Sequence, residues 1–310
     1  MPFPSPSLRK SFRVIGRNLK IDQGTVRNRI RKFQQKGLIN EFYLGVNPSL
    51  FGFKIGALFF DVRPESGKED LAIKISELDK ILLVCDYLGP KLSALFCYTI
   101  EEDLKKTMRQ ITRMANSEEV FYQDKPFLRC KDMKLTPSDW KVICSLQNAD
   151  PWKKSFSEVA RDTGLSTKTT KSRIQRLAEG GAVYLLASVN LGAFESFVPA
   201  DLNIDYESLE SRDKVVDLIK EYLGDMLVFA DIEDQHHGYF AIAVPSIARI
   251  RAIKSWTKSC KGVRSARVEV LHSILSVRRF YEEQVKESTE LLRISAPLGY
   301  QTRTTGLQSR

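Results

Sequence analysis

One arginine-rich pattern occurs twice in the sequence, and this repeat constrains the fold more than any other feature. TVRNRIRKF occupies residues 25–33 and TTKSRIQRL occupies residues 169–177, each just before a glycine and a short apolar run. Self-similarity at a fixed offset indicates repeated structural units. The chain is therefore predicted to contain two copies of one unit. At the offset of 144 residues, the matching pairs are Phe12 and Phe156, Ile15 and Val159, Arg17 and Arg161, Ile21 and Leu165, Thr25 and Thr169, Arg29 and Arg173, Ile30 and Ile174, and Gly37 and Gly181.

The second copy has the pattern of three helices followed by a strand pair. Residues 135–148 are amphipathic, and Thr136 is placed to cap a helix there. A second helix is predicted from Phe156 to about Thr163 and a third from Thr167 to about Glu179, with glycines closing both. The alternating apolar residues of 183–189 predict the hairpin of a winged helix. This order is typical of a winged helix-turn-helix.

The first copy has no room for the first of these helices. Shifting residues 135–148 back by 144 positions places them ahead of residue 1. The first winged helix-turn-helix is therefore expected to lack its first helix. Either the true start lies upstream, which we favour, or the first copy is degenerate, or the MPFPSP stretch and another segment cover the gap.

The third helix of each copy is predicted to bind DNA. In the first copy Val26, Ile30 and Phe33 are spaced i, i+4 and i+7 and predict a buried stripe, while the opposite side is polar and basic. A helix fits the major groove of B-DNA, and residues near its amino end reach the base edges. Candidate base-reading residues are Gln23, Gly24, Thr25, Arg27 and Asn28 in the first copy and Thr167, Lys168, Thr169, Lys171 and Ser172 in the second; candidate phosphate contacts are Arg31, Lys32, Lys36 and Arg176. Arg29 and Arg173 border the apolar stripe and suit either packing or pairing within the helix.

Positive charge is gathered around these helices. Residues 1–60 contain 11 Lys and Arg against two acidic residues, and residues 151–192 contain seven against three. The whole chain carries a net charge of +10, so the remainder is negative, at −3. Localised positive charge is the expected feature of a protein that contacts a phosphate backbone. A solvated charged surface is the alternative for either segment alone, and the repeat favours the nucleic-acid interpretation.

Each basic segment is followed by a second pattern, βαββαβ, which is the ferredoxin-like order. The fold class is therefore predicted to be α+β, with tandem winged helix-turn-helix and ferredoxin-like units. In the first copy the strands are expected at 53–62, 81–88, 92–100 and about 118–127, with helices at 67–79 and through Leu104, Met108, Ile111 and Ala115. In the second they are expected at 197–205, 226–233, 238–244 and 263–272, with helices through Leu209, Val216, Ile219 and Leu223 and through Ile250, Ile253 and Cys260.

Five segments follow from these patterns. A polar helix with the sequence YEEQVKESTELLR and a tail that is expected to be disordered end the chain. The predicted divisions are 1–50 for the truncated first winged helix-turn-helix, 51–130 for the first ferredoxin-like domain, 131–192 for the second winged helix-turn-helix, 193–275 for the second ferredoxin-like domain and 276–310 for the final helix and tail.

The chain resembles the leucine-responsive (Lrp/AsnC) transcription regulators. The resemblance covers about residues 11–127 and 135–273, and its most specific parts are the two third helices and the glycines after them. It implies double-stranded DNA as partner and association through the ferredoxin-like domains. Because these regulators usually carry one such unit, the chain resembles a fused pair that would read an asymmetric site with two unlike helices.

The same resemblance implies a place for a small-molecule effector. Relatives often bind amino acids near the turn between the middle strands of the ferredoxin-like domain, where a Gly and an Asp usually stand. The corresponding turns here are LGPKLS and EDQHHGY, and neither reproduces that pattern closely. The candidate effector residues are therefore Gly89, Lys91, Asp234 and His236.

Other functions have less support in the sequence. Sirohaem decarboxylases resemble the same architecture and are the enzyme alternative, but their pocket is expected to need histidines, and only His236, His237 and His272 occur here. We find no phosphate-binding loop, GxSxG or HExxH, so no enzyme, metal or cofactor is predicted. RNA-binding modules usually show stacking aromatics, whereas the outward faces here are Arg, Lys, Asn and Thr.

The remaining features indicate an ordinary reducing compartment. The five cysteines form no CxxC pair, so we expect neither zinc nor disulfides, and we interpret them as small apolar core residues: Cys85, Cys97, Cys130, Cys144 and Cys260. The first residues lack the apolar core of a signal peptide, and no apolar run approaches the roughly 18 residues that span a membrane. A soluble cytoplasmic protein is expected.

Overall fold

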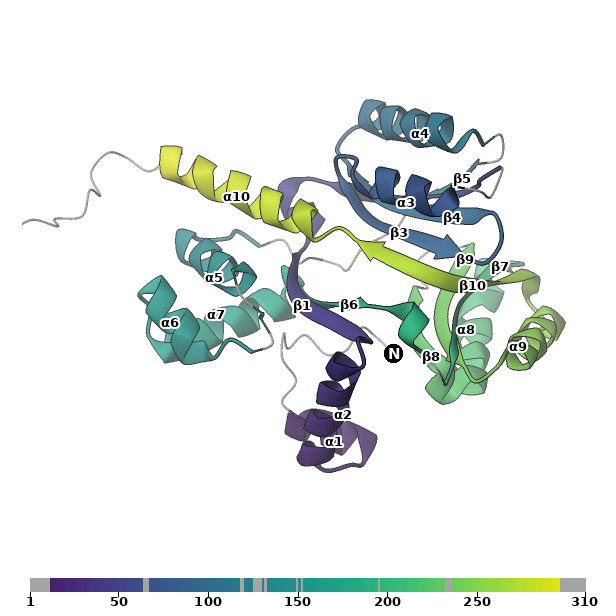
Figure 1. Cartoon of the computed structure of the whole chain (residues 1–310), viewed down its shortest axis with the longest axis horizontal. Helices are drawn as coiled ribbons and strands as arrows, with labels where there is room; N and C mark the ends of the chain where they lie inside the picture. Colours follow the sequence, from purple (N-terminus) through teal and green to yellow (C-terminus); the bar gives the residue numbers. More distant parts are fainter. Residues whose placement is uncertain are drawn as a thin grey trace, which may run out of the picture.

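The computed structural model has a mixed α+β fold, as predicted, in which helices flank one long, curved sheet (Figure 1). It describes residues 12–63, 67–117, 120–124, 130, 133–148, 150–151, 153–194, 196–231 and 236–295. The final tail, which was expected to be disordered, lies outside them.

The order of elements in each half follows the predicted pattern. The first half contains α1 (Phe12–Leu19), α2 (Gln23–Gln35), β1 (Ile39–Val46), β2 (Lys54–Asp61), α3 (Lys68–Ser76), β3 (Ile81–Tyr87), β4 (Lys91–Tyr98), α4 (Glu101–Ala115) and β5 (Val120–Asp124). The second half contains α5 (Pro137–Gln147), α6 (Phe156–Thr163), α7 (Thr167–Glu179), β6 (Val183–Val189), β7 (Val198–Tyr206), α8 (Leu209–Leu223), β8 (Leu227–Asp231), β9 (His237–Val244), α9 (Ile247–Ser259) and β10 (Val263–Ser276), and α10 (Arg278–Ser295) follows. The predicted bounds of α6 and α7 are confirmed.

The two ferredoxin-like units form one eight-stranded sheet, in the order β5-β2-β4-β3-β10-β7-β9-β8. β10 joins the units because it is long enough, at 14 residues, to pair with β7 over its first part and with β3 over its last. The buried Tyr87 hydroxyl of β3 donates a hydrogen bond of 2.8 Å to Asp201 of β7, and Tyr239 donates another of 2.8 Å to the same carboxylate. The junction is therefore closed by polar contacts as well as by strand pairing.

The predicted hairpin after each third helix is wrong. Residues 183–189 form the single strand β6, which pairs antiparallel with β1 of the other half, from Ile39 opposite Val189 to Val46 opposite Val183. Alternating apolar residues predict a strand but not its partner, and here the partner lies far away in the sequence. The two halves therefore share a two-stranded ribbon.

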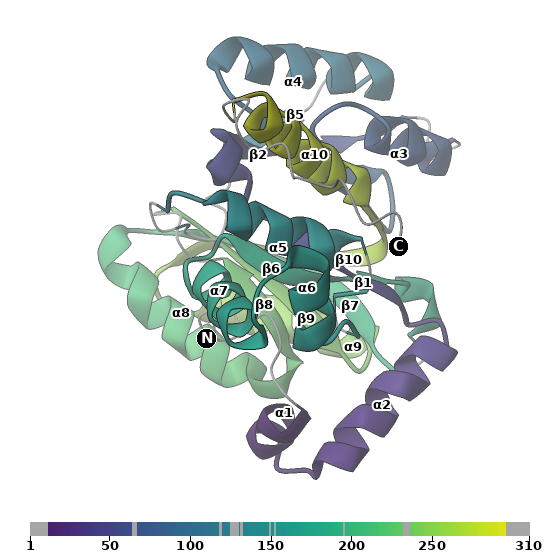
Figure 2. The same ribbon diagram turned by 90° about the vertical axis from the view of Figure 1, so that its left-hand side faces the viewer.

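This ribbon and α10 complete the core of the second helix-turn-helix. Leu44 and Val46 of β1 and Val285 of α10 are buried beside Trp140 and Leu177. Arg278, at the start of α10, pairs with Glu41 of β1 at 2.7 Å. Figure 2 shows α10 running past α5. The core of the second helix-turn-helix therefore contains residues from three distant parts of the chain.

The predicted buried stripe of the first third helix is only partly confirmed. Val26 is buried and Ile30 is half-buried, but Phe33 is 42% exposed, whereas its counterpart Leu177 is 0% exposed. Leu19 of α1 is also 60% exposed. The reason is that α5 covers α7 in the second half, while no described residue forms a corresponding helix over α2.

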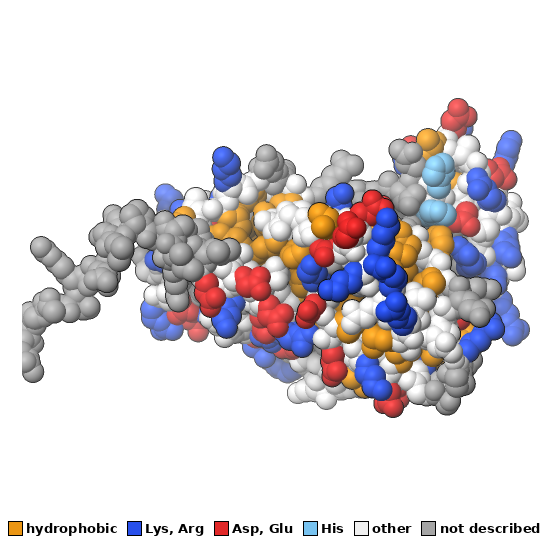
Figure 3. Space-filling view, turned by 90° about the horizontal axis from the view of Figure 1, so that it is seen from above, with side chains coloured by type: hydrophobic (Ala, Val, Ile, Leu, Met, Phe, Trp, Pro, Cys, Tyr) orange, Lys and Arg blue, Asp and Glu red, His pale blue; other side chains and the backbone are white. Residues whose placement is uncertain are grey.

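Charge on the upper face, which carries α3, α4 and α10, is mixed. Figure 3 shows Lys and Arg side chains interspersed there with Asp and Glu and with apolar patches.

Among the described residues no helix has the length and apolarity to cross a membrane.

Candidate nucleic-acid interface

The first candidate reading helix, α2, begins at a well-formed cap. The Asp22 carboxylate accepts a hydrogen bond of 2.9 Å from the Thr25 backbone N–H and a second from the Thr25 hydroxyl. These two hydrogen bonds hold the pKa of Asp22 below its usual value. The cap fixes the helix start, which is the end that the sequence assigned to base reading.

The outer surface of α2 is strongly basic. Gln23, Arg27, Asn28, Arg31 and Lys32 are exposed. Thr25 and Gly24 are half-buried at the first turn, and Lys36 is exposed at the C-cap. No acidic residue occurs between positions 23 and 40. Within the described part of the chain, Arg29, Arg31 and Lys32 form no ion pair. The helix therefore presents cations that are open to an anionic partner.

The second candidate, α7, has a similar beginning. Ser166 is its N-cap and accepts a hydrogen bond of 3.1 Å from the Thr169 backbone N–H. Five predicted base-reading residues are all exposed on its first two turns, namely Thr167, Lys168, Thr169, Lys171 and Ser172. The structure thus gathers the predicted residues of each copy on one helix surface.

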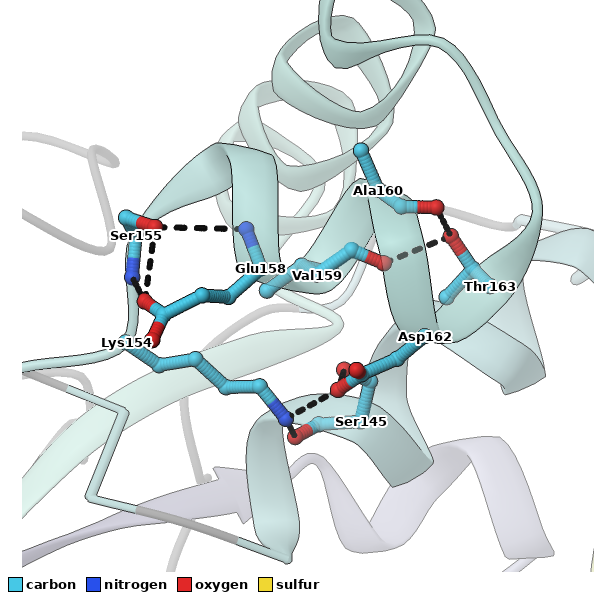
Figure 4. Close-up of polar contacts among 8 residues, drawn as sticks. All are labelled: Ser145, Lys154, Ser155, Glu158, Val159, Ala160, Asp162 and Thr163. Atoms are coloured by element: carbon cyan, nitrogen blue, oxygen red, sulfur yellow. Dashed lines mark hydrogen bonds and ion pairs between the residues drawn. The ribbon is translucent and has the colours of Figure 1, made fainter.

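The turn before α7 is held by polar contacts between α5 and α6 (Figure 4). Ser155 and Glu158 form a reciprocal capping box at the start of α6. Asp162, near the end of α6, pairs with Lys154 at 2.5 Å and accepts a hydrogen bond of 2.9 Å from Ser145 of α5. These contacts fix α6 on α5 and so fix the loop that leads into α7.

A buried carboxylate ties α7 to α5. Asp139 is 0% exposed and pairs with Arg173 at 2.8 Å and with Arg176 at 2.5 Å. It also accepts hydrogen bonds from the Thr136 backbone and hydroxyl. Burial raises the pKa of this carboxyl, but hydrogen bonds from Arg176, Thr136 and Arg173 outweigh it and lower the pKa to about 2. Asp139 is therefore ionised at neutral pH.

The ion pairs of Asp139 occupy two of the basic side chains of α7, Arg173 and Arg176. Arg176 was predicted as a phosphate contact, yet the structure places its guanidinium on Asp139 with the side chain 44% exposed. Arg173, which had been expected to pack or to pair within the helix, pairs with the same carboxylate of another helix. Sequence reasoning missed Asp139 because a single acidic residue in an amphipathic helix gives no sign of its partners.

The ribbon sets the separation of α2 and α7. α2 leads into β1 at Ile39, and α7 leads into β6 at Val183, which lies opposite Val46. The two helices therefore join opposite ends of the ribbon, roughly 20 Å apart at about 3.4 Å per residue. Figure 1 shows α7 and α2 at different ends of β1 and β6, with α1 and α2 projecting from the body.

The candidate effector residues are not brought into one site. Gly89 has a left-handed φ of +88° and lines a pocket of about 440 Å³ together with Lys68, Asp86 and His272. Lys91 instead pairs with Glu269. His236 is exposed in the turn before β9, and Asp234 lies outside the described residues.

Histidines and cysteines form no reactive cluster in the described part of the chain. His237 contacts Asp205 at 2.5 Å and the edge of Phe121, whereas His272 is 51% exposed. In these ranges no group of three or more His, Cys, Asp or Glu could hold a metal ion. Cys85 and Cys97 are buried, as expected, and Cys130, Cys144 and Cys260 are half-buried.

Comparison with known proteins gives two kinds of likeness. No family model matches the chain. Over 75 residues, 24% of the chain, it is 44% identical to the HTH-type transcriptional regulator Ptr1 of Methanocaldococcus jannaschii. Over 82 residues it is 35% identical to an uncharacterised HTH-type transcriptional regulator of Pyrococcus furiosus. The chain spans about half the length of these curated relatives, 50% and 52% respectively. Part of the chain is thus homologous to helix-turn-helix transcriptional regulators.

The other likeness concerns the fold. The siroheme decarboxylase NirDL, solved in complex with an iron-uroporphyrin III analogue, aligns with a TM-score of 0.57 over 94% of this chain and 96% of its own. The sequences are 13% identical, so the likeness shows the fold alone. It extends over both halves of the chain.

Proposed function

We propose that the protein is a sequence-specific, DNA-binding transcription regulator that reads duplex DNA with α2 and α7. The observation that carries the proposal is that each half presents, at the same place in the repeat, a capped helix with exposed basic and amide side chains. The partial homology to transcriptional regulators supports it. Helices of this kind enter the major groove with their amino ends toward the bases.

The site that such a pair reads is asymmetric. Arg27 and Asn28 of α2 correspond to Lys171 and Ser172 of α7, so the two helices offer different hydrogen-bond donors to the base edges. Two halves joined through β1 and β6 and through β3 and β10 act as an internal dimer. Reading helices at opposite ends of one ribbon would meet two separate half-sites of the duplex. A homodimer of the chain would present four such helices.

Selection from a random duplex library, at low and at moderate salt, tests this proposal. We expect enrichment of a two-part, non-palindromic site whose affinity falls steeply as salt rises. Enrichment of a palindromic site would contradict the proposal that the two helices read different sequences. Failure to bind any duplex at low salt would refute the regulator function altogether.

A sirohaem decarboxylase-like enzyme is the second candidate, because the fold of NirDL matches over nearly the whole chain. Purified protein mixed with an iron-uroporphyrin tests it. A saturable Soret-band shift, together with loss of a carboxylate from the added tetrapyrrole, would favour the enzyme. No spectral change would leave DNA binding as the function with support.

An effector is a further part of the regulator proposal. The pocket at Gly89 is the place where a small polar molecule could bind, since Lys68 and His272 line it beside Asp86. Thermal unfolding in the presence of each amino acid in turn would detect it as a concentration-dependent rise in Tm. An unchanged Tm with every amino acid would argue against this class of effector.

A further inference from the structure

The outer helix of the second half, α9, carries an unusual distribution of charge. Residues 247–261 contain five Lys and Arg and no Asp or Glu. Arg251, Lys254, Lys258 and Lys261 are all exposed. In the described ranges none of these four forms an ion pair. The segment lies more than 65 residues from either reading helix in the sequence, so its charge is a separate feature from theirs.

These cations occupy one flank of α9. Arg251, Lys254 and Lys258 are spaced i, i+3 and i+7, which places them on one side of a helix. The opposite flank is already occupied, because Trp256 stacks on Tyr222 of α8 with ring centroids 3.7 Å apart. We call Arg251, Lys254 and Lys258, together with Lys261 in the turn that follows α9, the α9 basic flank.

The corresponding helix of the first half shows that the fold does not require this flank. α4 has the same place in the βαββαβ order, yet its first turn contains Glu101, Glu102 and Asp103. Lys105 of α4 pairs with Glu101 at 2.7 Å. The unpaired positive charge is thus particular to α9.

The arrangement of the molecule places α9 on the side of a reading helix. Figures 1 and 2 both show α9 in the lower half of the molecule, together with α1 and α2, whereas α3 and α4 lie at the top. A duplex that enters from below to meet α2 would therefore approach α9 and would not approach α4.

We propose that the α9 basic flank binds the phosphate backbone of duplex DNA outside the segment read by α2 and α7. The proposal rests on the proposed function, and it adds a second, sequence-independent contact surface to it. Charge complementarity selects this partner, because a row of unpaired cations along a helix suits the closely spaced phosphates of a duplex. The contact lengthens the footprint and raises affinity without adding base specificity.

Charge reversal on the flank tests the proposal with two duplexes. One duplex contains only the site enriched by selection, and the other adds about one helical turn of flanking sequence, roughly 10 base pairs, on each side. For Lys254→Glu/Lys258→Glu we expect affinity for the longer duplex to fall about tenfold and the slope of log K against log salt to become shallower by about two, since each phosphate contact contributes about 0.9. Affinity for the shorter duplex should stay unchanged.

The matched control is Lys106→Glu/Arg113→Glu on α4, which alters net charge equally on the opposite side of the molecule. It should leave both affinities unchanged, and melting curves check that both variants are folded. The proposal would be overturned if the α9 variant lost equal affinity for the two duplexes or lost no affinity for the longer one. It would also be overturned if the α4 control lost as much affinity as the α9 variant. Failure of the unmodified chain to bind either duplex would instead refute the proposed function itself.

Discussion

Replacing Asp139 by Asn tests how α7, the second of the two helices that we propose read DNA, is held on α5. Asp139 is fully buried and neutralises Arg173 and Arg176, both of which belong to α7. Its pKa is lowered from 3.8 to about 2. Since one pKa unit equals about 1.4 kcal/mol, the ionised carboxylate stabilises the folded chain by about 2 kcal/mol at neutral pH. Asparagine keeps the volume and removes the charge, so we expect a loss of that size.

The dependence on pH distinguishes this cause from a packing defect. Because the pKa of Asp139 is lower in the folded state, its stabilisation is complete above the unfolded value of 3.8 and is lost as the pH falls toward about 2. The stability difference between the unmodified chain and Asp139→Asn should therefore be constant between neutral pH and about pH 5 and shrink below about pH 4.

Urea denaturation at several pH values measures this difference, with tryptophan fluorescence as the signal because Trp140 is adjacent to Asp139 and buried. Asp162→Asn is the control, since that carboxylate pairs with Lys154 at a more exposed position and should matter less. A difference that persists unchanged down to about pH 2 would refute the electrostatic reasoning.

Three further outcomes are expected. Arg27→Ala should relax base preference at one position and cost about 1 to 3 kcal/mol if it meets a guanine, whereas Arg31→Ala should weaken all duplexes alike and reduce the salt slope by about one; competition binding separates the two. Tyr87→Phe removes a hydrogen bond to buried Asp201 and should cost about 1 to 3 kcal/mol in urea unfolding, with no change in the salt slope. Val285→Ala should lower the stability of the second helix-turn-helix by about 2 kcal/mol, and an unchanged urea midpoint would show that α10 does not contribute to that core.

Local signals in the sequence predicted the helices well. Thr136 is the residue that caps α5, as predicted, and the predicted bounds of α6 and α7 agree with the structure. A cap is a contact between residues three positions apart, so the sequence contains both partners side by side. The order of strands in each ferredoxin-like unit followed similarly from alternation and spacing.

Contacts between distant segments could not be predicted in the same way. The pairing of β1 with β6 and of β10 with β3 depends on how the two units meet. The sequences of these four strands do not identify their partners. The exposure of Phe33 follows from the same limitation, because the apolar spacing indicates a stripe and does not say what covers it. Arg176 is a third case, since its charge suggested phosphate binding while its partner Asp139 lies 37 residues away.

If α2 and α7 read DNA as proposed, these long-range contacts determine the spacing of the half-sites. Tandem modules on a flexible linker accept half-sites at many spacings. Here α2 and α7 are continuous with the two strands of one ribbon, and Arg278 of α10 fixes that ribbon through Glu41. α7 is further held by Asp139, whereas α2 lacks a covering helix among the described residues and keeps Arg29 and Lys32 unpaired. On the proposed function, the two half-sites therefore have a fixed spacing and the two helices contribute unequally. The unpaired cations of α2 would supply more of the salt-dependent affinity, and α7 would make its contacts from a rigid frame. Inserting one helical half-turn between the half-sites, about five base pairs, should therefore abolish two-part binding, while leaving the weaker, strongly salt-dependent binding through α2.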